Sequence, residues 1–424
     1  MAFCRAKYSI KNVLKYHVIP SITLLFLTIS SQSLAFAGNP ELSFRVWNLF
    51  GNSFSWMFVL ALISWAVLWL HLPFKNVKGP PSPSGIQPMY RTGGKVYFCV
   101  TVSLLLAVSA FNPQLCVEIY RNMSQILGTL NIVALSLCVY LVTWKTGNNA
   151  GAHKMQNQTS IVYEFFMGSE LHPRLLGMDV KQLTSPRLGN MMWQIFNIIF
   201  FIAGWKLRGF DAGHFVNVLL QTVYIYKAFY MENYFFSMFE MMEDCAGYYL
   251  CWGSLVWMPC FYTFQSYFFV HHPTDMSTFW STIILAVGLL AIYLNYCVNA
   301  QKLQFRNELN LNEKLNDEMS IKPVGIPVKY VAPNGELKQT HLLISGWWGV
   351  ARKMNYTFEL VATIAWSLPG IAYGIWCGLY FAFLFMLLVY RVLYRDEVKC
   401  KRKYGRGWVK YCTKVPYRFI PYLF

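Results

Sequence analysis

The chain has 424 residues, of which 56% are hydrophobic and 18% aromatic, and only 13% are charged, where a soluble domain carries roughly a quarter. This composition excludes a soluble enzyme, a disordered chain and a small disulfide scaffold, and it favours an all-α, polytopic membrane protein. The net charge of +17 would suggest nucleic acid in a soluble chain, but the basic residues lie between and after apolar segments. We therefore interpret them as topology signals and expect no nucleic-acid partner.

Apolar stretches long enough to cross a bilayer recur along the chain. They lie near 18–37, 53–73, 96–113, 126–144, 191–205, 213–230, 246–270 and 277–299, with one longer tract over 358–390. That tract exceeds a single crossing, and Ser367, Pro369, Gly370 and Gly374 near its middle predict a turn. The sequence thus predicts about ten transmembrane helices.

Basic residues gather in every other loop of this arrangement. They precede the first span and follow the second and fourth spans, at Arg5, Lys7, Lys11, Lys15, Lys75, Lys78, Arg91, Lys95, Lys145, Lys154, Arg174, Lys181 and Arg187. The positive-inside rule therefore puts both termini in the cytoplasm. The first apolar stretch, which ends in small residues at 35–38, also fits a cleavable signal peptide. We favour an uncleaved first helix because it explains the charge alternation without a further assumption.

The sequence lacks the motifs of common cofactor folds. The eleven cysteines form no CxxC pair, and the eight histidines form neither HExxH nor a paired set for a di-iron centre. We therefore expect no metal site. Neither GxGxxG after a strand pattern nor GxxxxGK[ST] is present, which excludes a Rossmann fold and a P-loop. Any nucleotide must be held by side chains.

Polar and basic residues concentrate in the last third of the chain. A polar loop expected over 301–356 and the tail over 391–424 together hold 18 of the 36 Lys and Arg residues, on the predicted cytoplasmic side. Positive-inside topology and anionic lipid headgroups account for any single lysine. The density of Arg, Asn, Asp, Tyr and Trp also suits a dinucleotide, because cations bind phosphates, carboxylates and amides bind ribose hydroxyls, and aromatic faces pack on rings.

Two segments of this region resemble the signatures of a known family. SGWWGVARKMNY (345–356) and RDEVKCKRKYGRGWVKYCTKVPYRFIP (395–421) are similar to those of the sterol reductases, which include the 7-dehydrocholesterol, C-14 and C-24(28) sterol reductases and the lamin B receptor. The resemblance extends over most of the chain beyond residue 75, through GPPSPSG (79–85), FFMGSELHPR (165–174), the run at 243–273 and QKLQFR (301–306). Within the family the chain most resembles the 7-dehydrocholesterol reductase branch.

This resemblance implies a ten-helix membrane fold in which NADPH lies in a cytoplasm-facing pocket and a sterol enters from the bilayer. It implies one domain over 1–424, with N-terminal helices over 1–210 and the NADPH and sterol pockets over 211–424. Carried over by position, the cofactor contacts are Lys302, Arg306, Leu343, Trp348, Asn355, Tyr356, Asp396, Cys400, Lys401, Arg402, Lys403, Tyr404 and Tyr411.

Two positions depart from the family pattern. The family usually has His where this chain has Lys353, and Asn where it has His172. Because Lys353 keeps a positive charge, we expect cofactor binding to persist.

Reduction of a sterol double bond requires an acid as well as a hydride, because the alkene carries no electron-withdrawing group that could accept the hydride alone. Ionisable residues at membrane spans are candidates because their burial is expensive. We expect the acid among Asp244, Tyr262 and Glu240, with Asp244 opening the helix of GYYLCWG and Glu240 one turn before it. Negative charge there also suits a helix N-terminus whether or not chemistry occurs. Further ionisable residues at the spans are Lys227, Glu232 and Glu243.

Other functions fit parts of the pattern. Reduction at C-14 or C-24(28) in place of C-7 would need only a shift of the sterol along the cavity. The tail also resembles that of membrane isoprenylcysteine methyltransferases, although QKLQFR and SGWWGVAR favour the reductase. A non-catalytic sterol-binding protein is the third alternative. Membrane lipids are expected partners, in the endoplasmic reticulum of a eukaryote or the inner membrane of a bacterium, and the sequence carries no sign of the oligomeric state.

Overall fold

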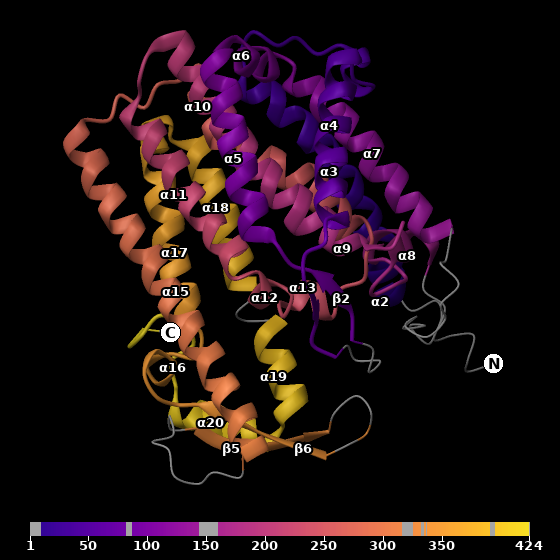
Figure 1. Cartoon of the computed structure of the whole chain (residues 1–424), viewed down its shortest axis with the longest axis vertical. Helices are drawn as coiled ribbons and strands as arrows, with labels where there is room; N and C mark the ends of the chain where they lie inside the picture. Colours follow the sequence, from indigo (N-terminus) through magenta and orange to yellow (C-terminus); the bar gives the residue numbers. More distant parts are fainter. Residues whose placement is uncertain are drawn as a thin grey trace. The chain divides into compact units, whose positions relative to one another are not determined.

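The computed structural model of the chain describes residues 10–81, 87–143, 160–315, 325–331, 335, 337–390 and 395–423. The fold is mostly helical (Figure 1). Its contacts divide the chain into two compact units, which are described separately: unit 1 comprises 1–211 and 228–273, and unit 2 comprises 212–227 and 274–424. The division expected at residue 210 stays a prediction. Outside the described residues lie most of GPPSPSG and the basic residues Arg5, Lys7, Lys145 and Lys154.

Unit 1 is built from helices and two short antiparallel strand pairs. Its first helices are α2 (Ile10–Val13), η1 (Leu14–Val18), α3 (Ile19–Gly38), η2 (Val46–Leu49), α4 (Ser53–His71), α5 (Gly94–Phe111), α6 (Pro113–Arg121), α7 (Met123–Thr143) and α8 (Ile161–Met167). Its later helices are α9 (Val180–Gln182), η3 (Leu183–Gly189), α10 (Asn190–Arg208), α12 (Glu232–Phe235), α13 (Phe239–Met242), η4 (Tyr248–Tyr262) and α14 (Phe264–Phe269). The pairs are β1 (Asn76–Lys78) with β2 (Met89–Arg91), and β3 (Arg174–Leu175) with β4 (Met178–Asp179).

Helix α7 packs against α3, α4 and η4 in unit 1. Buried polar side chains tie these helices together: Trp252 Nε1 donates to Asn131 Oδ1 at 2.8 Å, and Asn131 Nδ2 donates to Ser31 Oγ at 3.3 Å. Tyr267 donates its hydroxyl to the Ala35 carbonyl at 3.0 Å. Each of these hydrogen bonds satisfies a buried polar group, which needs a partner away from water, and whether the first apolar segment is cleaved stays a prediction.

Two of the expected loop charges are buried in unit 1. Lys181 and Arg187 lie in α9 and η3 and are 0% and 1% exposed. Arg187 pairs with Glu232 at 2.5 Å between Nη2 and Oε1, and Glu232 also accepts the backbone N–H of Gly94 at 2.8 Å. The interpretation of Lys181 and Arg187 as loop charges is therefore wrong, because each has buried partners far away in the sequence.

Unit 2 combines the first part of α11 (Ala212–Tyr230) with long helices and one β-hairpin. Its elements are α15 (Thr278–Leu315), β5 (Gly325–Val331), β6 (Leu337–Leu343), α16 (Trp347–Val350), α17 (Met354–Ser367), η5 (Leu368–Tyr373), α18 (Ile375–Tyr390), α19 (Glu397–Tyr404) and α20 (Arg406–Lys414). Strands β5 and β6 are antiparallel, with Gly325 opposite Leu343 and Val331 opposite Leu337. The hairpin contacts α15, α19 and α20.

The prediction of a polar loop over 301–356 is wrong for most of the described residues in that range, which are helical or in strands. Helix α15 continues to Leu315, well past the apolar segment, because residues 301–315 contain neither Gly nor Pro and are rich in good helix formers. The hairpin β5–β6 and the short helix α16 follow. The QKLQFR motif is therefore helical, which fixes the side chains of Lys302 and Arg306 on α15.

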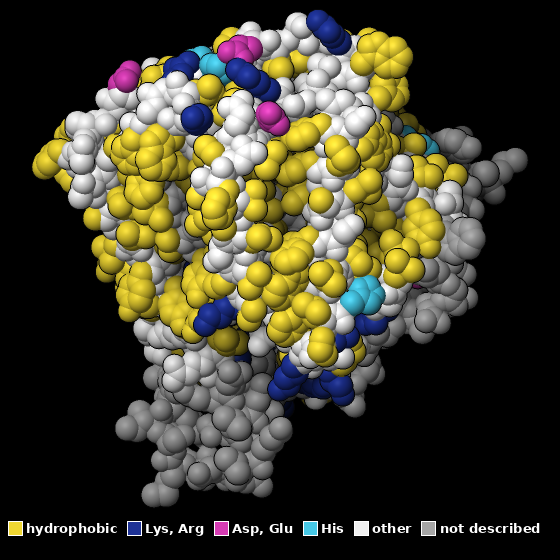
Figure 2. Space-filling model, turned by 45° about the horizontal axis from the view of Figure 1, so that its top comes forward, with side chains coloured by type: hydrophobic (Ala, Val, Ile, Leu, Met, Phe, Trp, Pro, Cys, Tyr) yellow, Lys and Arg dark blue, Asp and Glu magenta, His cyan; other side chains and the backbone are white. Residues whose placement is uncertain are grey.

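Six helices of the described residues are long and apolar enough to cross a membrane, over Leu14–Gly38, Val46–His71, Gly94–Phe111, Met123–Thr143, Val180–Arg208 and Thr278–Arg306. They coincide with six of the expected spans. Hydrophobic side chains cover much of the face seen in Figure 2, as expected of a surface that contacts lipid. The chain is therefore a mostly helical membrane protein.

The other expected spans are helical but are not among these six, so the count of ten stays a prediction. Helix α11 carries polar side chains and Lys227 along its 19 residues, and η4 is separated from α14 at Thr263. Helices α17 and α18 have 14 and 16 residues, fewer than the roughly 20 of a full crossing. Between them lies the predicted turn, formed by η5 and by Gly374 at φ +54°.

Candidate functional site

All thirteen predicted cofactor residues lie in unit 2, on the second half of α15, on β6, on the helices α16, α17, α19 and α20, and at Asp396 directly before α19. An apolar cluster holds these elements together. Leu343 and Trp348 pack with Val298, Phe305 and Met354, and all five are less than 9% exposed. The predicted polar residues therefore lie next to a packed apolar cluster.

Trp348 is the centre of this region. Its Nε1 donates to the Val298 carbonyl at 2.9 Å, and its own carbonyl accepts the Tyr411 hydroxyl at 3.4 Å. The Lys302 ammonium lies 4.3 Å from the centroid of the Trp348 ring, a cation–π distance. Gly346 precedes the helix at φ +57°, and a Cβ there would meet Gln301 Nε2 at 1.9 Å. A glycine is therefore required where the chain enters α16.

Asp396 accepts hydrogen bonds from polar residues at the start of α17. Its Oδ2 accepts a hydrogen bond from Lys353 Nζ at 2.5 Å and from the Tyr356 hydroxyl at 3.3 Å. Lys302 lies within electrostatic range of Asp396, Lys353 and Arg306. Lys302 thus has two basic neighbours and one acidic neighbour in this group, and the excess of basic side chains suits an anionic ligand.

Arg352, which precedes Lys353, binds the C-terminal tail through an ion pair and hydrogen bonds. Its Nη2 pairs with Glu397 Oε1 at 3.1 Å, and its Nη1 donates to the carbonyls of Val415 and Pro416 at 3.1 and 3.2 Å. Glu397 also accepts Trp408 Nε1 at 3.1 Å. The sequence analysis did not assign Arg352 a role, because its partners lie more than 40 residues away.

The tail helices bury part of their polar side chains against the hairpin. Cys400 and Tyr404 pack against Trp408 and Tyr411. Burial raises the pKa of Tyr404 to about 12. Burial also raises the pKa of the Cys400 thiol, and the positive charges of Lys353 and Lys302 partly oppose this rise. These groups are therefore neutral at physiological pH.

The predicted basic residues of α19 are exposed. Lys403 lies 4.4 Å from the ring centroid of Tyr330 on β5. Lys401, Arg402 and, on α15, Arg306 face outward. The structure therefore brings Lys302, Leu343, Trp348, Tyr356, Asp396, Cys400, Tyr404 and Tyr411 into linked contacts, and it leaves the outer cations at the edge.

A line of polar side chains connects Asn355 to the interior of unit 2. The Asn355 carbonyl accepts Asn295 Nδ2 at 2.7 Å, and Asn295 Oδ1 accepts Lys227 Nζ at 2.5 Å. The Lys227 ammonium lies 4.4 Å from the centroid of the Tyr224 ring, and the Tyr224 hydroxyl donates to Glu359 Oε1 at 2.9 Å. Asn355 Oδ1 is buried without a hydrogen-bond partner among the described residues.

Sequence reasoning noted Lys227 but missed Tyr224 and Glu359. Glu359 lies in the apolar tract 358–390, and this single acid among apolar residues was the signal that could have found it.

The three predicted acids lie in unit 1 and occupy different elements. Glu240 is in α13, Asp244 follows α13 and is 6% exposed, and Tyr262 ends η4 with its ring 4.9 Å from that of Trp193. Lys181 Nζ donates to the carbonyls of Glu240, Met241 and Asp244 at 3.2, 2.7 and 2.8 Å. This buried lysine fixes the backbone that carries two of the predicted acids.

The expectation that Asp244 opens the helix of GYYLCWG is wrong. Helix η4 begins at Tyr248, and residues 244–247 are not helical. The Ala246 N–H donates to the Glu170 carbonyl at 2.9 Å. A Cβ at Gly247 would lie 2.2 Å from Gly168 N. Gly247 is extended, and this segment packs backbone to backbone against residues 168–170.

The helix η4 itself is a π-helix of 15 residues with Pro259 inside it. Such helices are rare and often occur at functional sites. Among the described residues, no group of three or more His, Cys, Asp and Glu side chains is arranged to hold a metal ion.

Six candidate spans and a cationic, aromatic site at the end of α15 define a polytopic membrane protein with a polar site in unit 2. The sequence profile of the ergosterol biosynthesis ERG4/ERG24 family matches residues 9–424. The chain therefore belongs to this family of sterol reductases.

Individual relatives are similar over most of their length. The chain is 33% identical to the 7-dehydrocholesterol reductase of Arabidopsis thaliana over 365 residues, which are 84% of this chain and 82% of the relative. It is 31% identical to the 7-dehydrocholesterol reductase of Xenopus laevis, over 82% of this chain and 73% of the relative. It is 29% identical to the Delta(14)-sterol reductase of Methylotuvimicrobium alcaliphilum, over 85% and 80%.

Proposed function

We propose that this protein uses NADPH to reduce a carbon–carbon double bond of a sterol, namely the Δ7 bond of 7-dehydrocholesterol or of a related Δ5,7 sterol. The observation that carries the proposal is the cluster in which Asp396 joins Lys353 and Tyr356 beside Lys302 and Trp348. The names of the relatives from Arabidopsis thaliana and Xenopus laevis support the choice of the Δ7 bond.

The residues present suit NADPH. Lys302 and Arg306 offer positive charge for phosphates, Asp396 and the buried Asn355 Oδ1 offer acceptors for ribose hydroxyls, and Tyr356 adds an aromatic face. Further contacts come from Leu343, Trp348, Cys400, Lys401, Arg402, Lys403, Tyr404 and Tyr411. When bound, NADPH supplies a hydride for one carbon of the double bond.

A residue of this chain must supply the proton that the other carbon gains. Asp244, Tyr262 and Glu240 are the candidates from the sequence. Tyr224, whose hydroxyl donates to Glu359 beside Lys227, is a further candidate, and it lies in the same unit as the cofactor residues. Apolar walls around such an acid exclude water and strengthen its electrostatic effect on the developing cation.

The proposal includes a location. The sterol enters from the bilayer, and the cofactor site faces the cytoplasm, where the positive-inside rule places the basic tail. The membrane is the endoplasmic reticulum of a eukaryote or the inner membrane of a bacterium. Membrane lipids are the other partners, and neither nucleic acid nor a metal takes part.

Two measurements on the full chain in detergent separate the roles of these residues: NADPH titration and turnover of 7-dehydrocholesterol. We expect Asp396→Ala and Asn355→Ala to weaken NADPH binding about tenfold or more, because each removes a hydrogen bond worth about 1.5 kcal/mol or more near charged groups. Asp275→Asn, a change at an exposed residue, is the control. Unchanged NADPH affinity in both site variants would refute the cofactor site.

The same measurements identify the acid. Replacement of the true acid leaves NADPH affinity unchanged and lowers turnover by about two to four powers of ten. Asp244→Asn, Glu240→Gln, Tyr262→Phe and Tyr224→Phe are compared in parallel. Full turnover in all four would refute every candidate.

The Δ14 bond is the first alternative substrate, because one relative is named a Delta(14)-sterol reductase, and the Δ24(28) bond is another. A membrane methyltransferase or a non-catalytic sterol-binding protein is the second alternative. Binding of S-adenosylmethionine in place of NADPH would favour the methyltransferase. Binding of NADPH and sterol without reduction would favour the non-catalytic protein.

A further inference from the structure

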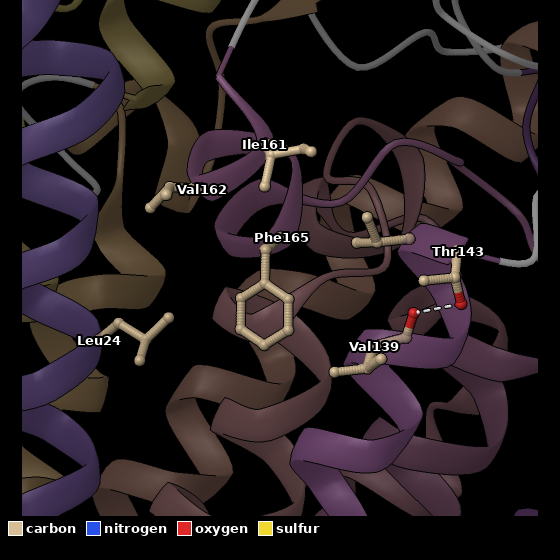
Figure 3. A pocket seen from close by; sticks show the side chains of 7 residues that line it. Leu24, Val139, Thr143, Ile161, Val162 and Phe165 are labelled. Carbon is tan, nitrogen blue, oxygen red and sulfur yellow. Dashed lines mark hydrogen bonds between the residues drawn. The ribbon is translucent and has the colours of Figure 1, made fainter.

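An apolar groove of about 230 Å³ opens in unit 1 between α3, α7 and α8. Figure 3 shows the Phe165 ring between Leu24 on one side and Val139 on the other. Among the described residues that line the groove, only Thr143 has a polar side chain, and its hydroxyl donates to the carbonyls of Val139 at 2.9 Å and Tyr140 at 3.4 Å. Its hydrogen-bonding capacity is used within α7, so the groove offers its occupant hydrocarbon contacts.

The size of the groove restricts the occupant. Pockets that enclose drug-sized ligands measure roughly 300–1,000 Å³, and this groove is smaller than that range. Both a whole acyl chain and a sterol exceed the volume of this open groove, so only a segment of the occupant lies in it. A flexible chain can bend to place a segment there, whereas a rigid four-ring nucleus cannot. The groove therefore suits an acyl chain better than a sterol.

A positive charge stands near the α8 side of the groove. Ser160, which precedes α8, donates its hydroxyl to the Tyr16 carbonyl on η1. The rings of Tyr16 and Tyr163 meet edge to face at 4.9 Å. Lys15 Nζ lies 4.9 Å from the centroid of the Tyr16 ring. Burial raises the pKa of Tyr163, and the charge of Lys15 opposes this rise. Lys15 is exposed, so its ammonium is accessible to a ligand.

The groove lies where two candidate spans end. One span runs Leu14–Gly38 and begins beside Lys15, and the other runs Met123–Thr143 and ends at the groove. Lipid headgroups meet their acyl chains at such a level. The basic residues before the first span put this level in the cytoplasmic leaflet, which holds the anionic phospholipids.

We propose that the groove between α3, α7 and α8 holds one acyl chain of an anionic phospholipid whose headgroup pairs with Lys15. The apolar lining and the limited volume select the chain, and the exposed lysine selects the charge of the headgroup. A neutral phospholipid would fill the same groove without the ion pair and would therefore bind more weakly.

Native mass spectrometry of the full chain in detergent tests this assignment, with phosphatidylserine and phosphatidylcholine as probes. We expect one phosphatidylserine to be retained at activation energies that remove phosphatidylcholine. Val139→Trp fills the groove at a residue that is 50% exposed and should abolish this retention. Lys15→Gln should lower the retention about fivefold, the effect of one lysine near an anionic headgroup.

Matched controls replace residues away from the groove. Leu60→Trp adds the same bulk at an α4 residue that is 52% exposed, and Lys75→Gln removes the exposed lysine after the second span. Both should retain phosphatidylserine as the unmodified chain does. All four changes are at exposed positions, and circular dichroism checks that each variant is folded.

Three outcomes would overturn the proposal. The first is equal retention of phosphatidylcholine, which would remove the role of Lys15. The second is unchanged retention of phosphatidylserine in Val139→Trp. The third is retention of an added sterol that Val139→Trp abolishes, which would make the groove a sterol site.

Discussion

Replacing Arg352 with alanine should release the C-terminal tail from α16. The side chain is only 7% exposed and loses an ion pair with Glu397 at 3.1 Å and two hydrogen bonds to the carbonyls of Val415 and Pro416. Removal of one partner of a buried ion pair destabilises by about 3–5 kcal/mol, and the lower end applies here because Glu397 is 20% exposed and keeps its hydrogen bond from Trp408. Because every 1.4 kcal/mol is a factor of ten, local opening should increase by about two powers of ten.

Hydrogen exchange measured by mass spectrometry reports this opening. We expect the amides of α20 in Arg352→Ala to exchange faster by about that factor, while α3 and α7 keep their protection. Arg406→Ala is the matched control, because Arg406 is an exposed arginine of α20 and surface changes of this kind shift stability by about 0.5 kcal/mol or less. Equal protection of α20 in the two variants would refute the role of Arg352.

Three further changes test other parts of the structure. Lys181→Met should lower the melting temperature in scanning fluorimetry, because three buried carbonyls lose their donor at about 1–3 kcal/mol each. The control Lys75→Met should leave the melting temperature unchanged. Equal melting temperatures of the two variants would contradict the burial of Lys181. Gly247→Ala should lower turnover and leave NADPH affinity unchanged. The added Cβ would lie 2.2 Å from Gly168 N and would displace the segment that carries the candidate acid Asp244. A loss of NADPH affinity would contradict this prediction. Iodoacetamide at pH 8 should modify Cys400 more slowly in the folded protein than in sodium dodecyl sulfate. Burial raises the pKa of the thiol, and only the thiolate reacts. Equal rates of modification would show that the thiol is not buried.

The sequence predicted the features that depend on local pattern. Hydropathy located six helices that the structure makes long and apolar enough to span a bilayer. The turn near residues 367–374 also followed from local chemistry, since Pro369 lacks a backbone donor and Gly374 adopts a positive φ of +54°. The residues that the family motifs predict as cofactor contacts lie on elements of unit 2, and their role stays a prediction.

The sequence failed where distant partners decide the outcome. Lys181 and Arg187 look like loop charges until their partners in residues 232–244 are known. Asp244 follows a helical pattern locally, but residues 244–247 are not helical, and they pack closely against the backbone of residues 168–170. Tyr224 and Glu359 are 135 residues apart, so no window of sequence shows that they meet.

The central claim is the reduction of a sterol double bond with NADPH, and one assay tests it most directly. Membranes that contain the chain are incubated with NADPH and, in turn, with 7-dehydrocholesterol, a Δ14 sterol and a Δ24(28) sterol, and the products are analysed by chromatography and mass spectrometry. We predict that the Δ7 bond alone is lost, with a mass gain of two hydrogens. Reduction of a different bond would correct the substrate, and NADPH binding without reduction of any sterol would contradict the claim.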